Sequence, residues 1–340
     1  MTGFIAAALA TLAALLAVLL SVRRSEAATH IFRIGREQAY NGMIRSDIPP
    51  ALEIDDGDTV VFNTRMLFEG RLDANMTIDD VLAIRGAIKS KGGGTYAFTG
   101  PFFVRGARPG DVLEVRIRRI VPGDFGVTYV YPDSIGLGGL PEGMGPGFFR
   151  TLRYSPDKKT VDFAPGITLT LRPFLGAMAV APKPGEVRQP AIPDYFAGNM
   201  DNKELVEGSS LFIPVNVEGA LFMAADAHGL QGDGEVSCLA CETYFEEVEL
   251  EFVVRRDMTL ERPMAETPTH WIVMGFHADL DEAMKIAIGD AIAFLMSAKG
   301  LTRTEAYALC SLAVDFRVTQ VVDGNKGIHG MIPKEIFRRA

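Results

Sequence analysis

Short runs in which apolar and polar residues alternate follow one another along most of this chain. A Gly-Asp turn leads into such a run at Asp55–Thr64 and again at Pro109–Ile117. Val161–Leu175 and Ser209–Ala225 predict further strands, joined by a connection over residues 176–202. Period-two alternation bounded by turn residues is typical of sandwiches and barrels. The pattern therefore predicts a mainly β fold, sandwich-like or barrel-like.

Two segments interrupt this alternation in the first half of the chain. Asp73–Ala87 predicts one short helix. Gly123–Arg150 is rich in glycine and proline and predicts a long loop. Loops of that length in compact proteins are commonly functional or disordered, so a lid and a merely mobile segment are both open interpretations.

The C-terminal part has the periodicity of a helix instead. Apolar residues recur at helical spacing over Leu280–Leu295. Asp279 and Glu282 precede and open this run in the manner of an N-terminal capping motif. Gly300 ends the helix, because glycine readily takes the left-handed conformation of a helix C-terminus.

A second helix follows directly. Thr302 and Glu305 have capping-box spacing, and the helix continues to about Leu312 before Arg317–Val322 returns to a strand. The expected fold class is thus mainly β with a mixed α/β C-terminal part that contains a helix pair packed on a sheet.

The length of 340 residues allows two packed units or one large β-rich domain. We predict a β-rich N-terminal domain over residues 28–175. Residues 176–340 form the second predicted domain, which is β-rich and then α/β and carries the polar motif described below. Exposed strand edges favour a homo-oligomer.

The first 27 residues predict a signal peptide or a membrane anchor. Residues 3–20 are apolar apart from Thr11, and Ser25-Glu26-Ala27 supplies small residues for a cleavage site. Arg23 and Arg24 follow the apolar run, which favours an anchor with the body in the cytoplasm. We expect a periplasmic or exported protein, with a membrane tether through residues 3–20 or a cytoplasmic location as alternatives.

Charge and cysteine content exclude several classes of protein. The net charge of −9 argues against a nucleic-acid partner, because phosphate binding needs a basic surface. Three cysteines are too few for a disulfide scaffold. Cys238 and Cys241 form a CxxC, but we expect both within a strand over Glu235–Phe252, where they are core thiols.

The most polar segment of the chain follows the apolar run Ala220–Ala225. Asp226 and His228 are two residues apart, as are Asp233 and Glu235, and residues so spaced share one face of a strand. The glycines between the two pairs permit a hairpin. Such a hairpin puts three carboxylates and one imidazole on a single wall. A cluster of this kind is costly to bury unless its members pair or bind something, so the segment predicts a site.

Several phrases of the sequence resemble the acetamidase/formamidase family. They are Thr99–Val104 with Gly106–Asp111, Gly198–Asp201, Gly219–Glu235, Asp279–Met284, and Val318–Asp323 continuing through His329. The resemblance spans about Ile31 to Phe337. It implies a mainly β fold with an α/β C-terminal part, and hydrolysis of a small aliphatic amide such as formamide or acetamide to the acid and ammonia. It also implies an oligomer.

Two positions depart from the family pattern. The family commonly carries a histidine before Thr99, where this chain has Tyr96. Near the start, a pattern of His and Trp-Asp is replaced by Tyr40–Ile44. If those family residues touch metal or substrate, the resemblance implies altered specificity or no amidase activity here.

The nucleophile expected for this chemistry is water. The chain has no Gly-Gly-Ser-Ser loop with a lysine, and its three cysteines all lie beside apolar residues. We hypothesise that Asp226, His228 and one of Asp201 or Asp233 hold a divalent metal, with zinc first, since zinc lowers the pKa of bound water to about 7. A carboxylate pair that activates water without metal is the alternative.

Other residues receive supporting roles in this hypothesis. Glu235 is the general base and proton shuttle, with Asp201 as a second catalytic carboxylate. Asn199 and Gln231 bind the substrate amide, since each offers a donor and an acceptor. His329, in a glycine-flanked loop, lines the pocket. Glu242 is either a partner of this site or a charge on a strand face.

A different class of function also fits the sequence. A non-catalytic, exported protein of the same fold could use the same cluster to bind a small ligand or a metal.

Overall fold

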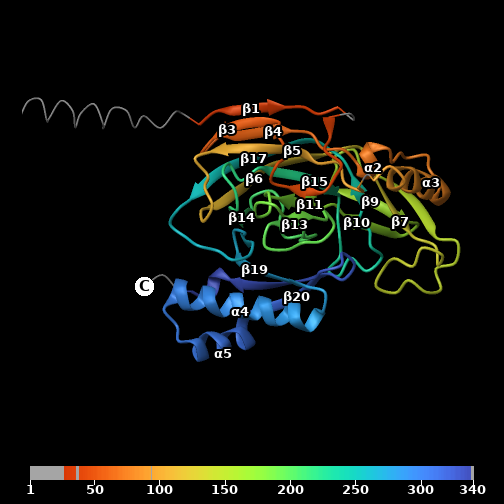
Figure 1. The fold of residues 1–340 in the computed structure, drawn as a ribbon. Helices are drawn as coiled ribbons and strands as arrows, with labels where there is room; N and C mark the ends of the chain where they lie inside the picture. Colours follow the sequence, from red (N-terminus) through yellow and green to blue (C-terminus); the bar gives the residue numbers. More distant parts are fainter. Residues whose placement is uncertain (1–26, 36–37, 93, 338–340) are drawn as a thin grey trace, which may run out of the picture.

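Two large β-sheets packed face to face form most of the molecule, and a helix pair covers one of them (Figure 1). The computed structural model describes residues 27–35, 38–92 and 94–337. Strands hold 39% of the residues and helices 17%, so the predicted mainly β class with a C-terminal helix pair is confirmed.

The nine-stranded sheet contains the two longest strands, β6 and β17, which pair antiparallel in its first half. Across this sheet the order is β1 (Thr29–Phe32), β4 (Thr59–Phe62), β17 (Phe245–Arg255), β6 (Val112–Pro122), β14 (Ser210–Pro214), β18 (Met264–Glu266), β19 (His270–His277), β21 (Lys326–Pro333) and β20 (Asp315–Gln320).

The eight-stranded sheet carries the polar segment singled out in the sequence. Its main path is β13 (Ala197–Asn199), β11 (Phe174–Ala179), β15 (Phe222–His228), β16 (Glu242–Thr243), β7 (Phe125–Val130) and β8 (Phe148–Arg153). Beside this path, β5 (Thr99–Arg105) pairs with β15 and with β3 (Leu52–Asp55).

Smaller elements lie around the sheets. Two two-stranded sheets pair β9 (Thr160–Ala164) with β10 (Ile167–Thr170), and β2 (Ile44–Arg45) with β12 (Val187–Arg188). The helices of the described residues are α2 (Leu67–Gly70), α3 (Ile78–Lys89), α4 (Leu280–Lys299), α5 (Arg303–Ala313) and the short η2 (Lys334–Ile336).

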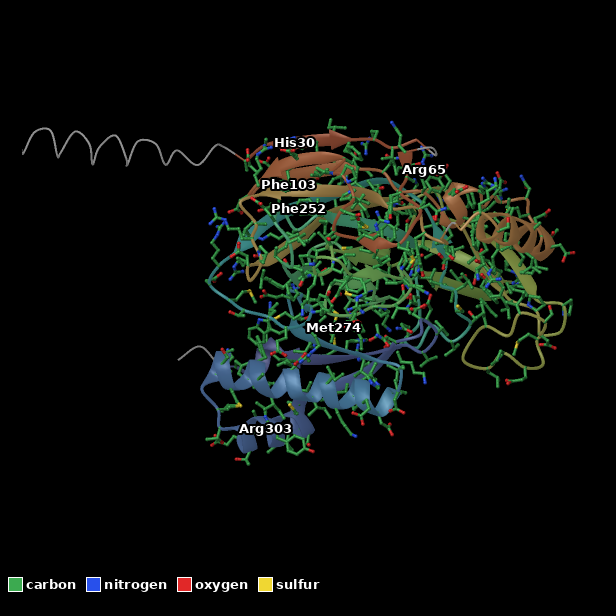
Figure 2. All side chains as sticks on the ribbon, viewed as in Figure 1. His30, Arg65, Phe103, Phe252, Met274 and Arg303 are labelled. Atoms are coloured by element: carbon green, nitrogen blue, oxygen red, sulfur yellow. The ribbon has the colours of Figure 1, made fainter. Side chains whose placement is uncertain are left out.

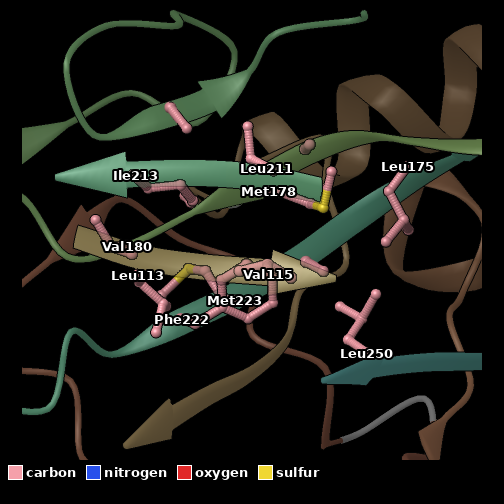
Figure 3. Close-up of a cluster of buried hydrophobic side chains, with 14 of the residues drawn as sticks. Leu113, Val115, Leu175, Met178, Val180, Leu211, Ile213, Phe222, Met223 and Leu250 are labelled. Carbon is pink, nitrogen blue, oxygen red and sulfur yellow. The ribbon is translucent and has the colours of Figure 1, made fainter. Parts of the chain in front are cut away.

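The main core lies between the two large sheets. Figure 3 shows Val115 and Leu250 of the nine-stranded sheet in the same buried cluster as Leu175 and Phe222 of the eight-stranded sheet. From Val248 onward, alternation along β17 buries every second side chain, and a register shift between Phe245 and Glu247 precedes it. The glutamates of residues 246–251 therefore point away from the core.

Strand β19 joins this core to the helix pair. Ile272 and Met274 belong to the main core, and Figure 2 labels Met274 between the sheets and the helices. On the other face of the strand, Val273 packs with Ala291 and Leu295 of α4. The molecule therefore has three layers in this region, with helices outside and two sheets within.

The capping residues of the helix pair act as predicted. The Asp279 side chain accepts hydrogen bonds from the backbone at the start of α4, and Gly300 ends that helix with a left-handed φ of 66°. Thr302 and Glu305 form a complete capping box at the start of α5. The predicted helix over Asp73–Ala87 is α3, which begins a few residues later.

Three strand and loop predictions were wrong in detail. The expected loop over Gly123–Arg150 contains β7 and the start of β8, so within it residues 123–124 and 131–147 lie outside strands. Val161–Leu175 is interrupted by the β9–β10 turn at Gly166. Ser209–Ala225 is broken because Ala220 and Leu221 both have φ of 57°, which no strand tolerates.

The predicted domain division at residue 175 falls within β11. Both large sheets draw strands from either side of it. The predicted leader or anchor, with its tether over residues 3–20, lies outside the described residues and stays a prediction, as does the homo-oligomer. No helix among the described residues has the length and apolar character needed to cross a membrane.

Candidate functional site

One histidine and five acidic residues gather at one edge of the eight-stranded sheet. Asp226 and His228 lie on β15, and Glu242 lies on β16 directly opposite His228. Asp201 follows β13 by two residues, while Glu235 and Asp323 come from loops. These six residues are called the acidic cluster below. Segments far apart in sequence meet here because β13, β11, β15 and β16 are neighbours in the sheet.

Gly176 of β11 forms the floor of the acidic cluster. Its carbonyl accepts the backbone N–H of Asp201, and it lies opposite Asp226 between the paired residues of β11 and β15. A Cβ at this position would lie 2.5 Å from Asp201 Oδ1, 2.5 Å from Asp226 Oδ2 and 2.9 Å from the His228 ring. Glycine is required here because the side chains of its neighbours converge over its Cα.

His228 is the centre of the acidic cluster. Its Nε2 lies 3.2 Å from Asp226 Oδ2 and 3.4 Å from Glu242 Oε1. On the other side of the ring, Nδ1 lies 3.0 Å from Gln231 Oε1 and 3.9 Å from Asp201 Oδ1. Phe174 packs edge-on against the ring at 5.1 Å. The orientation of the imidazole is therefore held from every side.

Two overlapping triads of potential metal ligands share His228. One consists of Asp201, His228 and Glu235, and the other of Asp226, His228 and Glu242. In each triad one ligand atom from every residue lies within 4.8 Å of the others. All five residues are buried. Imidazole and carboxylate ligands at this spacing suit a divalent cation.

Within the described part of the chain, the carboxylates of the cluster are not balanced by lysine or arginine. Among the described residues, no lysine or arginine forms an ion pair with any of the five. Burial, followed by the charge of Asp226, raises the pKa of Asp201 to about 6. Burial likewise raises the pKa of Asp226, Glu235 and Asp323, the last two well above their ordinary values. The site therefore stabilises positive charge or bound protons.

The charge of the cluster also acts on the histidine. Burial by itself lowers the pKa of His228, but the charges of Asp226 and Glu242 outweigh it and raise that pKa well above its ordinary value. The protonated imidazole is thus the cation that the cluster itself supplies. A bound metal ion would take over this role.

Two buried oxygens in the cluster lack a hydrogen-bond partner. They are Asp201 Oδ1 and Asn199 Oδ1. Asn199 Nδ2 donates to Asp201 Oδ2 at 2.6 Å and to Asp323 Oδ2 at 3.2 Å. Leaving a buried acceptor unpaired costs about 1–3 kcal/mol, so both oxygens are suited to an external ligand.

The backbone at three cluster residues is strained. Asp201, Asp226 and Glu235 have φ of 52°, 62° and 43°, in the left-handed region. Aspartate tolerates this conformation better than most residues, whereas glutamate does so less readily. Strain of this kind is concentrated at functional sites, where the surrounding structure holds it in place.

The predicted hairpin after His228 does not form. Residues 229–241 form a loop, which is closed at its base by hydrogen bonds of Gly229 with Cys241 and of Cys241 with Leu230. Gly234 attaches this loop to β20, because its N–H donates to the Thr319 carbonyl. Glu235 therefore reaches the cluster from the turn of this loop.

Asp233 lies outside the acidic cluster. It is exposed, and its carboxylate pairs with Lys203 Nζ at 2.9 Å. The strand that was predicted to carry it beside Glu235 is absent, so the two side chains do not share a face. This placement leaves Asp201, the alternative named in the sequence, as the third ligand candidate.

Gln231 and His329 both make contacts within the protein, and their predicted role in substrate binding stays a prediction. Gln231 uses both ends of its amide within the protein, since Nε2 donates to the Asp201 carbonyl at 2.8 Å and Oε1 contacts His228. His329 lies on β21, where Nδ1 contacts Thr319 Oγ1 at 2.8 Å. Burial lowers the pKa of His329 to about 4, so it is neutral.

Two residues of the site were not assigned to it from sequence. Asp323 ends one of the family phrases, but no periodicity connected it with Asp226. Tyr96 was noted only as a departure from the family pattern. Burial and then the charges of Asp226, Asp323, Asp201 and Glu235 raise the pKa of Tyr96 well above its ordinary value, so it stays a neutral phenol beside the cluster.

The cysteines are free thiols. Cys238 and Cys241 lie in the loop before β16 instead of in the predicted strand, since that strand begins only at Phe245. Burial raises the pKa of each to about 12, which leaves them protonated and unreactive.

Comparisons with known proteins agree with this architecture. A family model described as the acetamidase/formamidase family matches residues 34–191 and 186–339. A putative formamidase from Schizosaccharomyces pombe is 27% identical over 250 residues, covering 58% of this chain and 59% of that protein. The chain thus spans about three fifths of the length of the curated relatives it matches.

Two solved structures share the fold over nearly the whole chain. An acetamidase from Bacillus halodurans is 29% identical with a TM-score of 0.80, covering 90% of this chain and 98% of that one. An acetamidase from Yersinia enterocolitica is 25% identical with a TM-score of 0.82, covering 93% and 95%. On the strength of the family match over both halves, the chain belongs to the acetamidase/formamidase family.

Proposed function

We propose that this protein hydrolyses the amide bond of small carboxamides, yielding a carboxylic acid and ammonia. The observation that carries the proposal is the acidic cluster: a buried histidine with five carboxylates and no lysine or arginine partner among the described residues. Membership of the acetamidase/formamidase family and the names of its relatives support amide hydrolysis as the reaction.

A divalent cation fits this site. His228 would hold it together with Asp201 and Glu235 or with Asp226 and Glu242, since the ligand atoms of each triad lie within 4.8 Å of one another. When bound, such a cation supplies Lewis acidity and lowers the pKa of water towards neutrality. Zinc is the first candidate because the site offers an imidazole, which is a common zinc ligand. Manganese and magnesium are further candidates because both bind carboxylates.

The side chains of the chain itself would move the protons. Glu235 accepts a proton from the attacking water and returns it to the departing nitrogen. One C–O bond forms and the C–N bond breaks, so the products are the acid and ammonia. Asn199 Oδ1 lacks a partner and can accept a hydrogen bond from the substrate N–H. Gln231 and Glu242 keep His228 in place.

The direct experiment measures ammonia released from acetamide by purified protein. The protein is stripped with chelator and then reloaded with zinc, manganese or magnesium, and bound metal is quantified by elemental analysis. We expect activity that is lost on stripping and restored by one metal. Activity that persists without metal favours a carboxylate pair. Folded, metal-loaded protein that releases no ammonia favours the non-catalytic binding function.

A glycine substitution tests the geometry of the site. Gly176→Ala places a methyl group 2.5 Å from two carboxylate oxygens, closer than such atoms approach, so it should lower metal affinity by at least about tenfold. Gly289→Ala in α4 is the matched control, because nothing lies within 4 Å of the added methyl. Equal metal binding by both variants would contradict the assignment of the space above Gly176.

A further inference from the structure

A cavity of about 240 Å³ lies beside the acidic cluster. One side of it is the loop from Leu230 to Cys241, and the other is made by side chains of β7, β8, β9 and β10. Val236 on its rim is 67% exposed, so the cavity is accessible from solvent.

The cavity adjoins the acidic cluster through two of its lining residues. Gln231 and Glu235 line it, and the same two residues belong to the environment of His228. Glu235 is a member of the ligand triad with Asp201 and His228. A molecule in the cavity would therefore present one end to the reacting groups and extend the rest of its length away from them.

The remainder of the wall is mostly apolar. Its apolar members include Leu152, Phe163, Leu169, Leu230, Leu239 and Ala240, and its further polar members are Thr128, Asp233 and Ser237. Leu152 is buried and belongs, with Phe163, Leu169 and Leu230, to a hydrophobic cluster separate from the main core. An apolar cavity with a few polar groups at one end is the common form of a small-molecule site.

The outer wall of the cavity is held in position. The β9–β10 hairpin, which supplies Phe163 and Leu169, is fastened by Arg150. The Arg150 guanidinium donates to the Phe163 carbonyl and stacks 4.7 Å from the centre of its ring. The cavity is therefore preformed, which favours binding because little ordering is needed.

We propose that the cavity binds the acyl chain of the substrate, and that the preferred substrates are primary amides with an apolar acyl group several carbons longer than acetyl. This inference rests on the proposed amide hydrolysis and names its substrate class. A water molecule takes about 30 Å³, so the methyl group of acetamide would leave most of the cavity to solvent. A longer chain displaces that water and covers the leucines.

The amide end of such a substrate lies at Glu235, and the balance of the reaction is unchanged. Water adds to the carbonyl carbon, the C–N bond breaks, and the proton from water leaves with ammonia. Since each buried methylene contributes about 0.8 kcal/mol, kcat/KM should rise about threefold to fourfold with each added methylene until the cavity is full.

The test is a series of straight-chain amides from acetamide through butyramide to hexanamide, with metal-loaded protein. We expect kcat/KM for hexanamide to exceed that for acetamide by at least about tenfold. Ala240→Leu fills the cavity and Leu169→Gln makes its wall polar, so both should remove this preference while acetamide hydrolysis persists. Ile167→Gln is the control, because Ile167 lies on the same hairpin, is 48% exposed and does not line the cavity.

The outcomes separate this inference from the proposed function. Measurable acetamide hydrolysis with equal kcat/KM along the series, or a preference that Leu169→Gln and Ala240→Leu leave intact in folded variants, overturns the acyl cavity alone. No ammonia from any amide overturns the proposed function. In that case calorimetric titration with hexanamide tests whether the cavity binds an acyl chain. Binding that Ala240→Leu abolishes supports the acyl cavity, and the absence of binding refutes it.

Discussion

Two groups of carboxylates in this molecule have different neighbours. Those on the outer face of the nine-stranded sheet pair with arginines, whereas those of the acidic cluster surround a histidine. On the outer face of β6 and β17, Glu114 lies 2.6 Å from Arg116 and 2.9 Å from Arg255. Glu251 lies 2.9 Å from Arg116 and also pairs with Arg118. The arginines lower the pKa of Glu114, although burial acts most strongly and in the opposite direction.

The acidic cluster has five carboxylates, and in the part of the chain that the structure describes their one ion-pair partner is His228. There the pKa values of Asp201 and Asp226 are raised instead of lowered. Glu114 is as buried as Asp201 and Asp226, so burial alone does not distinguish the two groups of acids. What distinguishes them is the counterion. Arginine side chains neutralise the outer carboxylates, whereas the carboxylates of the cluster keep negative charge that a bound cation could neutralise.

The largest effect is expected from removing a charge within the cluster. Asp226→Asn keeps the size and the tolerance of the left-handed backbone but removes a proposed metal ligand, so activity should fall by roughly a thousandfold or more. Asp233→Asn is the matched control, because Asp233 is exposed and pairs with Lys203. Elemental analysis and ammonia release measure both variants. Equal metal content in the two would contradict the ligand assignment.

The next effect concerns the stability of the metal-free protein. The pKa of Asp201 is raised from 3.8 to about 6, so this group stabilises the fold fully below pH 3.8 and loses that contribution as pH rises through 6. The loss is about 3 kcal/mol, at about 1.36 kcal/mol per pKa unit. Asp201→Asn should therefore be more stable than the wild type at pH 7.5, and the difference should shrink towards pH 4.

Urea denaturation in chelator at both pH values measures this difference. If the wild type became more stable relative to Asp201→Asn as pH rises, this result would contradict the raised pKa of Asp201. Saturating metal should abolish the advantage of the variant, because the metal replaces the proton as the partner of Asp201.

The smallest effect is expected from the outer face, and its pH dependence should have the opposite sign. Glu114→Gln removes one partner of two partly exposed arginines, so it should cost about 1–2 kcal/mol of the free energy of unfolding at pH 7. Because the pKa of Glu114 is lowered, its contribution is present above pH 4.5 and is lost as pH falls. Metal content and amide turnover should be unchanged. A loss of metal from this variant would mean that the two groups of acids are not independent.

Local patterns were sufficient for the elements whose signals lie within a few residues. The caps at Asp279 and Thr302 and the stop at Gly300 describe the helix pair, since capping depends on neighbouring backbone groups. The strand predicted over Glu235–Phe252 likewise contains most of β17. The left-handed residues Ala220 and Leu221 gave no such signal, because neither residue type favours that conformation.

The sequence by itself determined the mainly β class, the helix pair, the family and the central pair Asp226 and His228. Only the tertiary structure decided which other acids join them. Asp323 belongs to the acidic cluster and Asp233 lies outside it because Gly234 is attached to β20. This contact joins segments more than 80 residues apart. Strand order and loop attachment depend on such long-range contacts, and no local periodicity encodes them.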